Sequence, residues 1–154
     1  MTRASLFRGL SLIAGAGLWP AAAQRRSAGK QFLNVGGRKP PGYTHVVSSP
    51  PGRMIYISGQ GGADAEGKMP PDFATQARNT FENIGRCLAL AGAGFADIVK
   101  INYYVTDLAN TAELRRIRAG FLNMDAPPAA TLVQTGLGAG LMLEVEAVAM
   151  TPDR

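Results

Sequence analysis

Residues 97–107 read DIVKINYYVTD, and this stretch decides the class of fold. Its apolar residues occupy every second position: Val99, Ile101, Tyr103 and Val105. Lys100 and Asn102 fall between them. Successive side chains of a β-strand point to opposite faces, so a period of two is typical of a strand that buries one face. The stretch therefore predicts a strand with its apolar face toward a core and its polar face away from it.

A helix is predicted on each side of this strand. Before it, Asp72 has the position of an N-cap, and Gly92 has the position at which a helix ends. Between them, apolar residues recur at spacings of three and four and share one helical stripe: Phe73, Ala77, Phe81, Ile84 and Leu88. After the strand, residues 111–122 predict a second helix with these inward positions: Leu114, Ile117, Phe121 and Leu122.

Four further runs predict strands. Residues 44–49 and 54–60 are rich in β-branched and aromatic residues, and Pro50-Pro51-Gly52-Arg53 between them predicts a hairpin or a tight connection. Residues 130–135 and 141–150 follow the second helix and are separated by a Gly-rich link. Strands and helices interleaved in this order predict an α/β or α+β sandwich, with two helices on one face of a mixed sheet.

The other face of this sheet has no predicted cover. Met142, Val148 and Tyr104 would lie exposed on it in a monomer. Because an uncovered apolar patch usually marks an interface, we expect a homo-oligomer.

The N-terminus has the layout of a secretory signal peptide over residues 1–23. Arg3 and Arg8 are the positive region, residues 9–19 are the apolar region, and Ala21-Ala22-Ala23 is a small-residue cleavage site. The apolar run is shorter than the ~20 residues that cross a bilayer, although an uncleaved anchor is the alternative. The pattern predicts a periplasmic or secreted protein with no membrane association after cleavage.

A tail or linker is predicted at residues 24–42, which are rich in Gly, Pro and basic residues and include a short edge strand at residues 32–35. The folded domain is predicted to span residues 43–150. That length fits one domain. Cys87 is the single cysteine, so the chain has no intrachain disulfide.

The net charge of +5 is unevenly distributed. Seven of the sixteen Lys and Arg residues precede Tyr43, which leaves nine against eleven Asp and Glu from Tyr43 onward. Nucleic-acid sites cluster their basic residues beside aromatic ones, and the nearest candidate is Arg115, Arg116 and Arg118. On a helix these three arginines are expected to form a solvated face, so no nucleic-acid partner is predicted.

Most catalytic motifs are absent from the sequence. With one His and one Cys, a soft metal site or a Cys–His nucleophile pair is not expected, and no metal is predicted. Residues 58–62 (SGQGG) end a strand, and their glycines either admit a ligand close to the backbone or simply form a turn. Glu144 and Glu146 share one face of the last strand. They form either a solvated edge or a carboxylate pair that holds a water in a partly dry cleft.

Five blocks in this order resemble the RidA family of enamine/imine deaminases, also called YjgF-like. They are GYTHVV (42–47), YISGQ (56–60), TQARNTFENIGRCLALAGAG (75–94), DIVKINYYVTDL (97–108) and LEVEAVAM (143–150). The resemblance implies an α+β, chorismate-mutase-like fold, a homotrimer, and small-molecule clefts between its subunits. It also implies hydrolysis of 2-imino acids to 2-keto acids and ammonia without a cofactor.

The resemblance also assigns roles to individual residues. It implies that Tyr43, Ser58 and Gly59 contact the ligand and that Glu144 positions the attacking water. The family's P-A-R-[ST] block, whose arginine grips the substrate carboxylate, falls on Pro128, Ala129, Ala130 and Thr131. Ala130 thus stands at the arginine position, and Leu132 stands where many members have a cysteine. The Gly-rich link before Leu141 is about one residue shorter than usual.

The missing arginine limits the expected chemistry. An arginine fork makes two charge-assisted hydrogen bonds of about 1.5–3 kcal/mol each, so its loss implies at least a ~10²-fold loss in transition-state stabilisation. We therefore expect a RidA-like protein whose deaminase activity on 2-imino acids is altered or lost. The alternatives are a non-catalytic small-molecule-binding trimer and a chaperone-like or RNA-directed role.

Overall fold

The structure is a computed structural model that describes residues 29–138 and 140–152, so the predicted signal peptide lies outside the described residues. In chain order its elements are β1 (Gln31–Leu33), η1 (Val35–Gly37), β2 (Val46–Ser48), β3 (Gly52–Gln60), α1 (Phe73–Leu90), η2 (Phe95–Asp97), β4 (Ile98–Val105), η3 (Leu108–Asn110), α2 (Thr111–Arg118), β5 (Ala129–Gln134) and β6 (Leu143–Pro152).

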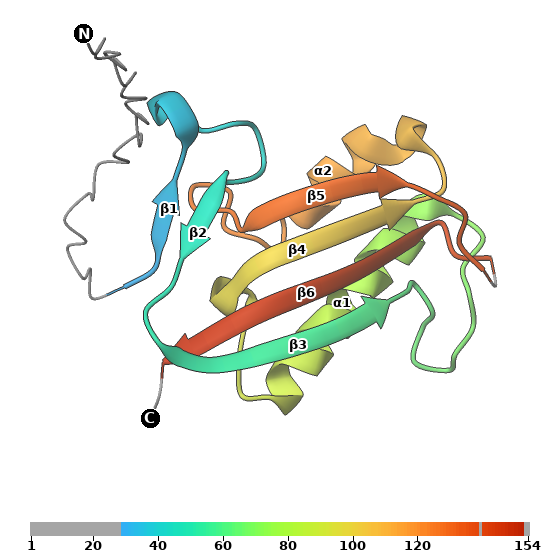
Figure 1. The fold of residues 1–154 in the computed structure, drawn as a ribbon. Helices are drawn as coiled ribbons and strands as arrows, with labels where there is room; N and C mark the ends of the chain where they lie inside the picture. The colour runs from blue at the N-terminus through green and yellow to red at the C-terminus, as the bar shows by residue number, and fades with distance from the viewer. Residues whose placement is uncertain (1–28, 139, 153–154) are drawn as a thin grey trace, which may run out of the picture.

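A four-stranded mixed sheet with the order β3-β6-β4-β5 forms the body of the fold. β4 and β5 are parallel, whereas β6 is antiparallel to both β3 and β4. Helices α1 and α2 lie against one face of this sheet and leave the other face open (Figure 1). The α+β class, the mixed sheet and the two helices on one face are as predicted.

Of the two predicted links between the first two strands, the hairpin is wrong and the tight connection is present, since β2 ends at Ser48 and β3 begins at Gly52. β2 pairs with β1 in a separate two-stranded sheet, and β3 pairs with β6. Pro50 and Pro51 explain the difference, because they lack the N–H donors of a hairpin turn and instead lead the chain from one sheet to the other. The edge strand expected at residues 32–35 is present as β1, which begins one residue earlier and ends at Leu33.

Helix α1 confirms the predicted stripe and both predicted ends. The Asp72 carboxylate accepts a hydrogen bond from the N–H of Thr75 at 2.8 Å. All five stripe residues are buried. At the other end Gly92 has φ of +66°, and the N–H of Ala93 donates to the carbonyl of Leu88 at 2.9 Å. That left-handed glycine closes a Schellman motif, which satisfies carbonyls of the last turn.

Two details of β4 and α2 differ from the prediction. β4 has a bulge between Ile98 and Lys100, so Ile98 is buried and Val99 is only half-buried. A bulge inserts one residue and changes which neighbour faces the core. Helix α2 ends at Arg118 rather than at residue 122, yet Leu122 is still buried and the ring of Phe121 stacks on Phe81 at 5.1 Å.

Arg118 contradicts the expected solvated arginine face. Its side chain is 6 % exposed, and its guanidinium lies 5.4 Å from the centroid of the Tyr103 ring. A Cβ added to Gly42 would lie 1.9 Å from Nη2 of Arg118, so the guanidinium fills the space beside this glycine. The sequence pattern missed this contact because Gly42 is distant in the chain and carries no side chain.

Candidate functional site

The open face of the sheet carries a band of polar side chains. Cross-strand register places Glu144 beside Tyr104, Glu146 beside Asn102, and Val148 beside Lys100. β5 continues these rows with Val133, Thr131 and Ala129. Successive residues of each strand alternate between faces, and the residues between these positions are buried in β4 and β6. The polar band is therefore turned away from the helices.

Gly59 and Glu144 meet at one end of this face, and Ser58 is the neighbour of Gly59 along β3. The β3–β6 register shifts between Ile57 and Gln60, so Ser58 and Gly59 form a bulge in β3. A Cβ added to Gly59 would lie 1.8 Å from Oε1 of Glu144. The carboxylate thus rests against the Gly59 backbone, and the absence of a side chain there allows the approach.

Glu146 is held by two donors that the sequence analysis did not single out. Its Oε1 accepts hydrogen bonds from Nδ2 of Asn102 at 2.7 Å and from the Tyr104 hydroxyl at 2.8 Å. The bond from Asn102, followed by that from Tyr104, lowers the pKa of Glu146 below its ordinary value of 4.5. The hydrogen bond to Glu146 in turn raises the pKa of Tyr104. The alternation of β4 contained the signal, because it places Asn102 and Tyr104 on one face.

Lys100 is the only cation among the described residues of the open face. Its Nζ donates a hydrogen bond to Oγ1 of Thr131 at 2.7 Å. This ammonium therefore lies over β5, the strand in which the arginine of the resemblance would stand. No arginine occupies the described open face.

Tyr43 lies at the other end of the sheet. The next residue, Thr44, donates from its N–H to the carbonyl of Pro128 at 3.2 Å and from its hydroxyl to the carbonyl of Pro127 at 2.6 Å. Those bonds hold Tyr43 beside the beginning of β5. The Tyr43 ring meets the exposed ring of His45 edge-on, at 5.6 Å between centroids.

One chain does not bring all the predicted site residues together. Ala129 is level with Lys100 and Val148, whereas Glu144 lies four residues before Val148 along β6. Four strand residues span about 13 Å and two inter-strand spacings about 10 Å, which gives about 16 Å from Ala129 to Glu144. A small imino acid cannot contact both ends at once. Tyr43 and the start of β5 therefore form one group, and Ser58, Gly59 and Glu144 form another.

Ala130 does not share the face of Glu144. Ala130 pairs with the buried Ile101, and its side chain packs against the hydrophobic core, as does that of Leu132. Ala129 and Thr131 are the neighbouring residues turned to the open face. We propose that the arginine position corresponds to Ala129, because Ala129 is turned to the same open face as Glu144. Starting the P-A-R-[ST] block at Pro127 gives this register and removes the one-residue shortening of the Gly-rich link.

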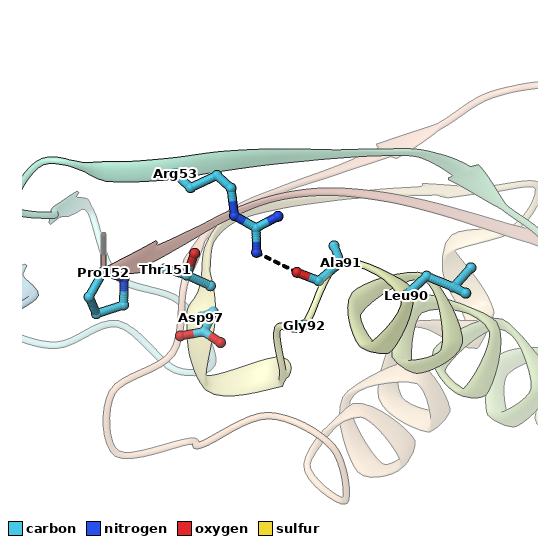
Figure 2. Close-up of a pocket in the computed structure, with 7 residues that line it drawn as sticks. All are labelled: Arg53, Leu90, Ala91, Gly92, Asp97, Thr151 and Pro152. Atoms are coloured by element: carbon cyan, nitrogen blue, oxygen red, sulfur yellow. Dashed lines mark hydrogen bonds between the residues drawn. The ribbon is translucent and has the colours of Figure 1, made fainter. Parts of the chain in front are cut away.

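Two hollows in the surface are candidates for a ligand site. A hollow of about 390 Å³ on the open face is lined by residues that include Ser58, Lys100 and Glu146. A larger hollow of about 790 Å³ lies where α1 ends (Figure 2). There Arg53 donates a hydrogen bond to the carbonyl of Ala91, the C-cap of α1. None of the predicted site residues lines the larger hollow, whereas Ser58 lines the smaller one. The open face is therefore the better candidate for the functional site.

Arg53 does not replace the missing arginine within one chain. It pairs with Thr151, seven residues along β6 from Glu144.

Within residues 29–138 and 140–152, no cluster of three or more His, Cys, Asp or Glu residues could hold a metal ion. No helix in the same ranges is long and apolar enough to cross a membrane.

Comparison with known proteins gives the family. A family model described as Endoribonuclease L-PSP matches residues 38–151. The RutC family protein YjgH of Escherichia coli K12 is 31% identical over 113 residues, which cover 73% of this chain and 85% of that protein. The 2-iminobutanoate/2-iminopropanoate deaminase of Rattus norvegicus is 30% identical over 100 residues, covering 64% and 73%.

Solved structures agree with this result. RidA from the Antarctic bacterium Psychrobacter is 34% identical, with a TM-score of 0.62 and coverage of 71% of this chain and 88% of that chain. Escherichia coli TdcF with bound serine is 31% identical, with a TM-score of 0.61 and coverage of 72% and 92%. The chain belongs to the RidA/YjgF family and has its α+β, chorismate-mutase-like fold.

Proposed function

We propose that this protein is a RidA-type protein with a small-molecule cleft between adjacent copies and an altered or lost activity on 2-imino acids. The observation that carries the proposal is the residue register of β5. Ala129 takes the arginine position on the open face, and the segment from Pro127 to Thr135 contains no charged residue. A substrate carboxylate would therefore lack a bidentate partner in the cleft.

A cleft between copies follows from the separation of the two residue groups. Ala129 lies about 16 Å from Glu144 by strand spacing, Tyr43 is held beside the start of β5, and the open face has no cover among the described residues. If one copy places its β5 end against the β3 end of the next, both groups face one ligand. A ring of such contacts closes with cyclic symmetry, and the trimer implied by the family resemblance is the proposed assembly.

Within the cleft, Glu144 is the proposed catalytic group. Its carboxylate lies against Gly59 at the β3 bulge, where a water held by Glu144 could attack a bound imine carbon. Hydrolysis adds this water to the C=N bond and releases ammonia and a carbonyl compound. Because the described open face carries no guanidinium, imines that are uncharged or anchored differently are the proposed substrates. No cofactor takes part in this scheme.

The alternative is a trimer that binds small molecules or acts as a chaperone without catalysis. The absence of an arginine at Ala129 supports this alternative as well. A cleft without that guanidinium can hold a ligand and still fail to orient it for attack. An RNA-directed role has less support. Arg116 is paired with Glu113 at 2.6 Å, Arg118 is buried, and the open face carries two glutamates against one lysine.

Turnover measurements separate these functions. Purified protein is supplied with 2-iminopropanoate generated in situ, and release of the keto acid is followed beside the rat 2-iminobutanoate/2-iminopropanoate deaminase. We expect the rate to be at least ~10²-fold below that of the rat enzyme. Equal rates would refute the proposal. Hydrolysis of an uncharged imine that disappears in Glu144→Gln selects the enzyme over the binding protein.

Export is proposed separately, from residues 1–23 alone. A mature N-terminus immediately after Ala23, measured by mass spectrometry of protein from the periplasm or medium, would support it. An intact Met1 in the cytoplasm would refute it.

A further inference from the structure

The Gly-rich link at residues 136–140 leads into the strand that carries Glu144. Gly140 has φ of +73°, a left-handed conformation that glycine adopts without strain, and Met142 follows two residues later. Glycine loses more conformational freedom on ordering than any other residue, so a link of this composition is costly to fix. The position of Glu144 therefore depends on what holds the end of the link.

The β3–β6 ladder does not provide that hold. In the described register it ends at Val145, so Leu143 and Glu144 pair with β4 alone. The end of a strand with one neighbouring strand opens more readily than a part that is paired on both sides. A contact from outside the sheet is needed to keep Glu144 against Gly59.

Gln76, near the start of α1, makes such contacts from the helix side of the sheet. It is 1 % exposed. Its Oε1 accepts a hydrogen bond from the N–H of Met142 at 2.8 Å. Its Nε2 donates to the carbonyl of Gly140 at 3.0 Å and to that of Pro70 at 2.8 Å. One buried amide, with both donor protons in use, thus joins α1 to the Gly-rich link, to the residue before β6 and to the loop before α1.

The same part of α1 sets the path of the chain after Gly59. A Cβ added to Gly62 would lie 2.5 Å from Cα of Gln76, so the backbone of Gly62 lies directly on the helix. Asn79, one turn later, donates from Nδ2 to the carbonyl of Gly62 at 3.0 Å. The two segments that meet at Gly59 and Glu144 are therefore both anchored to the beginning of α1.

We propose that Gln76 is the positioning residue for Glu144. Because it is buried on the helix side, it acts through the backbone of Met142, two residues before Glu144, and not on the ligand. A neutral amide suits this role, since it satisfies three buried or turn-bound backbone groups without placing a charge near the carboxylate. The proposal rests on the proposed function of Glu144 in imine hydrolysis, but the placement of Glu144 can be measured without turnover.

Proton NMR of the native protein and of Gln76→Met tests the placement. A Cβ added to Gly59 would lie 3.0 Å from Cγ of Glu144, so an α-hydrogen of Gly59 lies close to the γ-hydrogens of Glu144. The native protein should show a nuclear Overhauser cross-peak between these hydrogens. Gln76→Met keeps the length of the side chain, removes all three hydrogen bonds and should abolish the cross-peak. A cross-peak of native intensity in the variant would overturn the proposal.

Turnover of an uncharged imine gives the second measurement. Gln76→Met should lower kcat by about 10²-fold and leave KM within about twofold, because a misplacement of about 1 Å impairs attack without removing a ligand contact. A native kcat in the variant would contradict the role of Gln76. If the native protein hydrolyses no imine, the proposed catalytic function fails, and the cross-peak alone decides whether Gln76 places Glu144.

Two variants of α1 are matched controls. Thr80→Val removes the buried hydroxyl that donates to the backbone carbonyl of Gln76 at 2.8 Å and leaves the side-chain amide in place. Leu88→Ala removes core packing near the other end of α1 and should lower the melting temperature at least as much as Gln76→Met. Both should keep the cross-peak. Its loss in Leu88→Ala would show that it reports stability instead of position, which would refute the assignment.

Hydrogen exchange of the unchanged protein covers the case in which Gln76→Met does not fold. The backbone amide of Met142 and the side-chain amide of Gln76 should exchange more slowly than the backbone amide of the exposed Gly138. Exchange of either group as fast as that of Gly138 would reject the anchor without any substitution.

Discussion

Ala129→Arg is predicted to create deaminase activity that Ala130→Arg does not. Ala129 is turned to the open face, whereas Ala130 packs against the core. The two variants add the same side chain one residue apart and direct it to opposite sides of the sheet. Their comparison therefore isolates the effect of position from the effect of charge.

The expected gain can be worked from the contacts. Two charge-assisted hydrogen bonds to a substrate carboxylate contribute about 3–6 kcal/mol. Ordering the long arginine side chain costs about 1–2 kcal/mol, and repulsion from Lys100 in the neighbouring strand costs up to about 1 kcal/mol. The remainder is about 0–5 kcal/mol, and its midpoint of about 2.5 kcal/mol corresponds to about a 70-fold rise in kcat/KM.

The assay is keto-acid release from 2-iminopropanoate, with Ala129→Met as the control of similar length without charge. Ala130→Arg should show no gain and should lower the free energy of unfolding by about 1–3 kcal/mol, because it overpacks a position against the core. Activity in Ala130→Arg but not in Ala129→Arg would refute the register. Equal activity in Ala129→Arg and Ala129→Met would refute the electrostatic argument.

Three further predictions concern the backbone and the core. Gly59→Ala should abolish the imine hydrolysis that depends on Glu144, because the new Cβ would lie 1.8 Å from Oε1 of Glu144. Gly138→Ala is the control in the same assay, since a Cβ added there would have no heavy atom within 4 Å. Gly42→Ala should lower the melting temperature by several degrees, since the new Cβ meets Arg118 at 1.9 Å and φ is +83°, and an unchanged melting curve would contradict this. Burial raises the pKa of Tyr103 from 10.0 to about 12. The contribution of the neutral phenol to the free energy of unfolding is therefore complete below pH 10 and is lost as the pH rises toward 12. Denaturant titrations should show a loss of about 3 kcal/mol over this range. Tyr103→Phe should remove that part of the pH dependence, and an identical dependence in the variant would count against the assigned cause.

The fold was predictable where the signal is local. The period of α1, its cap at Asp72 and its stop at Gly92 depend on residues close in sequence, and the structure confirms all three. The partner of β2 was not predictable, because pairing depends on which distant strand is available once the prolines redirect the chain. The sequence pattern also did not predict the bulge at Val99, because one inserted residue leaves the apolar alternation almost unchanged.

The candidate site was predictable in its residue types more than in its arrangement. Glu144 and the Ser58–Gly59 strand end do lie together, because both stand at the same end of the β3–β6 pair. The sequence pattern places the arginine position at Ala130, whereas the strand register favours Ala129. A run of small apolar residues has no period from which to read a face, and only pairing with β4 shows that Ala130 is turned to the core. The site roles themselves remain predictions.

The hydrogen bonds of Lys100 and Glu146 could not be predicted from the sequence for a different reason. Each lies at an alternate position that the sequence reveals, yet their meeting requires the order β6-β4-β5 in the sheet. Non-consecutive strands form that order, so no local pattern contains it. The polar band is therefore visible only in the folded sheet.

A crystal structure of the assembled protein would show directly whether the two residue groups share one cleft. We expect Glu144 of one copy to face Ala129 of the partner subunit across that cleft. We also expect no guanidinium within ion-pair distance, ~4 Å, of a carboxylate placed between them. An arginine from either copy in that position, or Glu144 and Ala129 facing separate solvent surfaces, would contradict it.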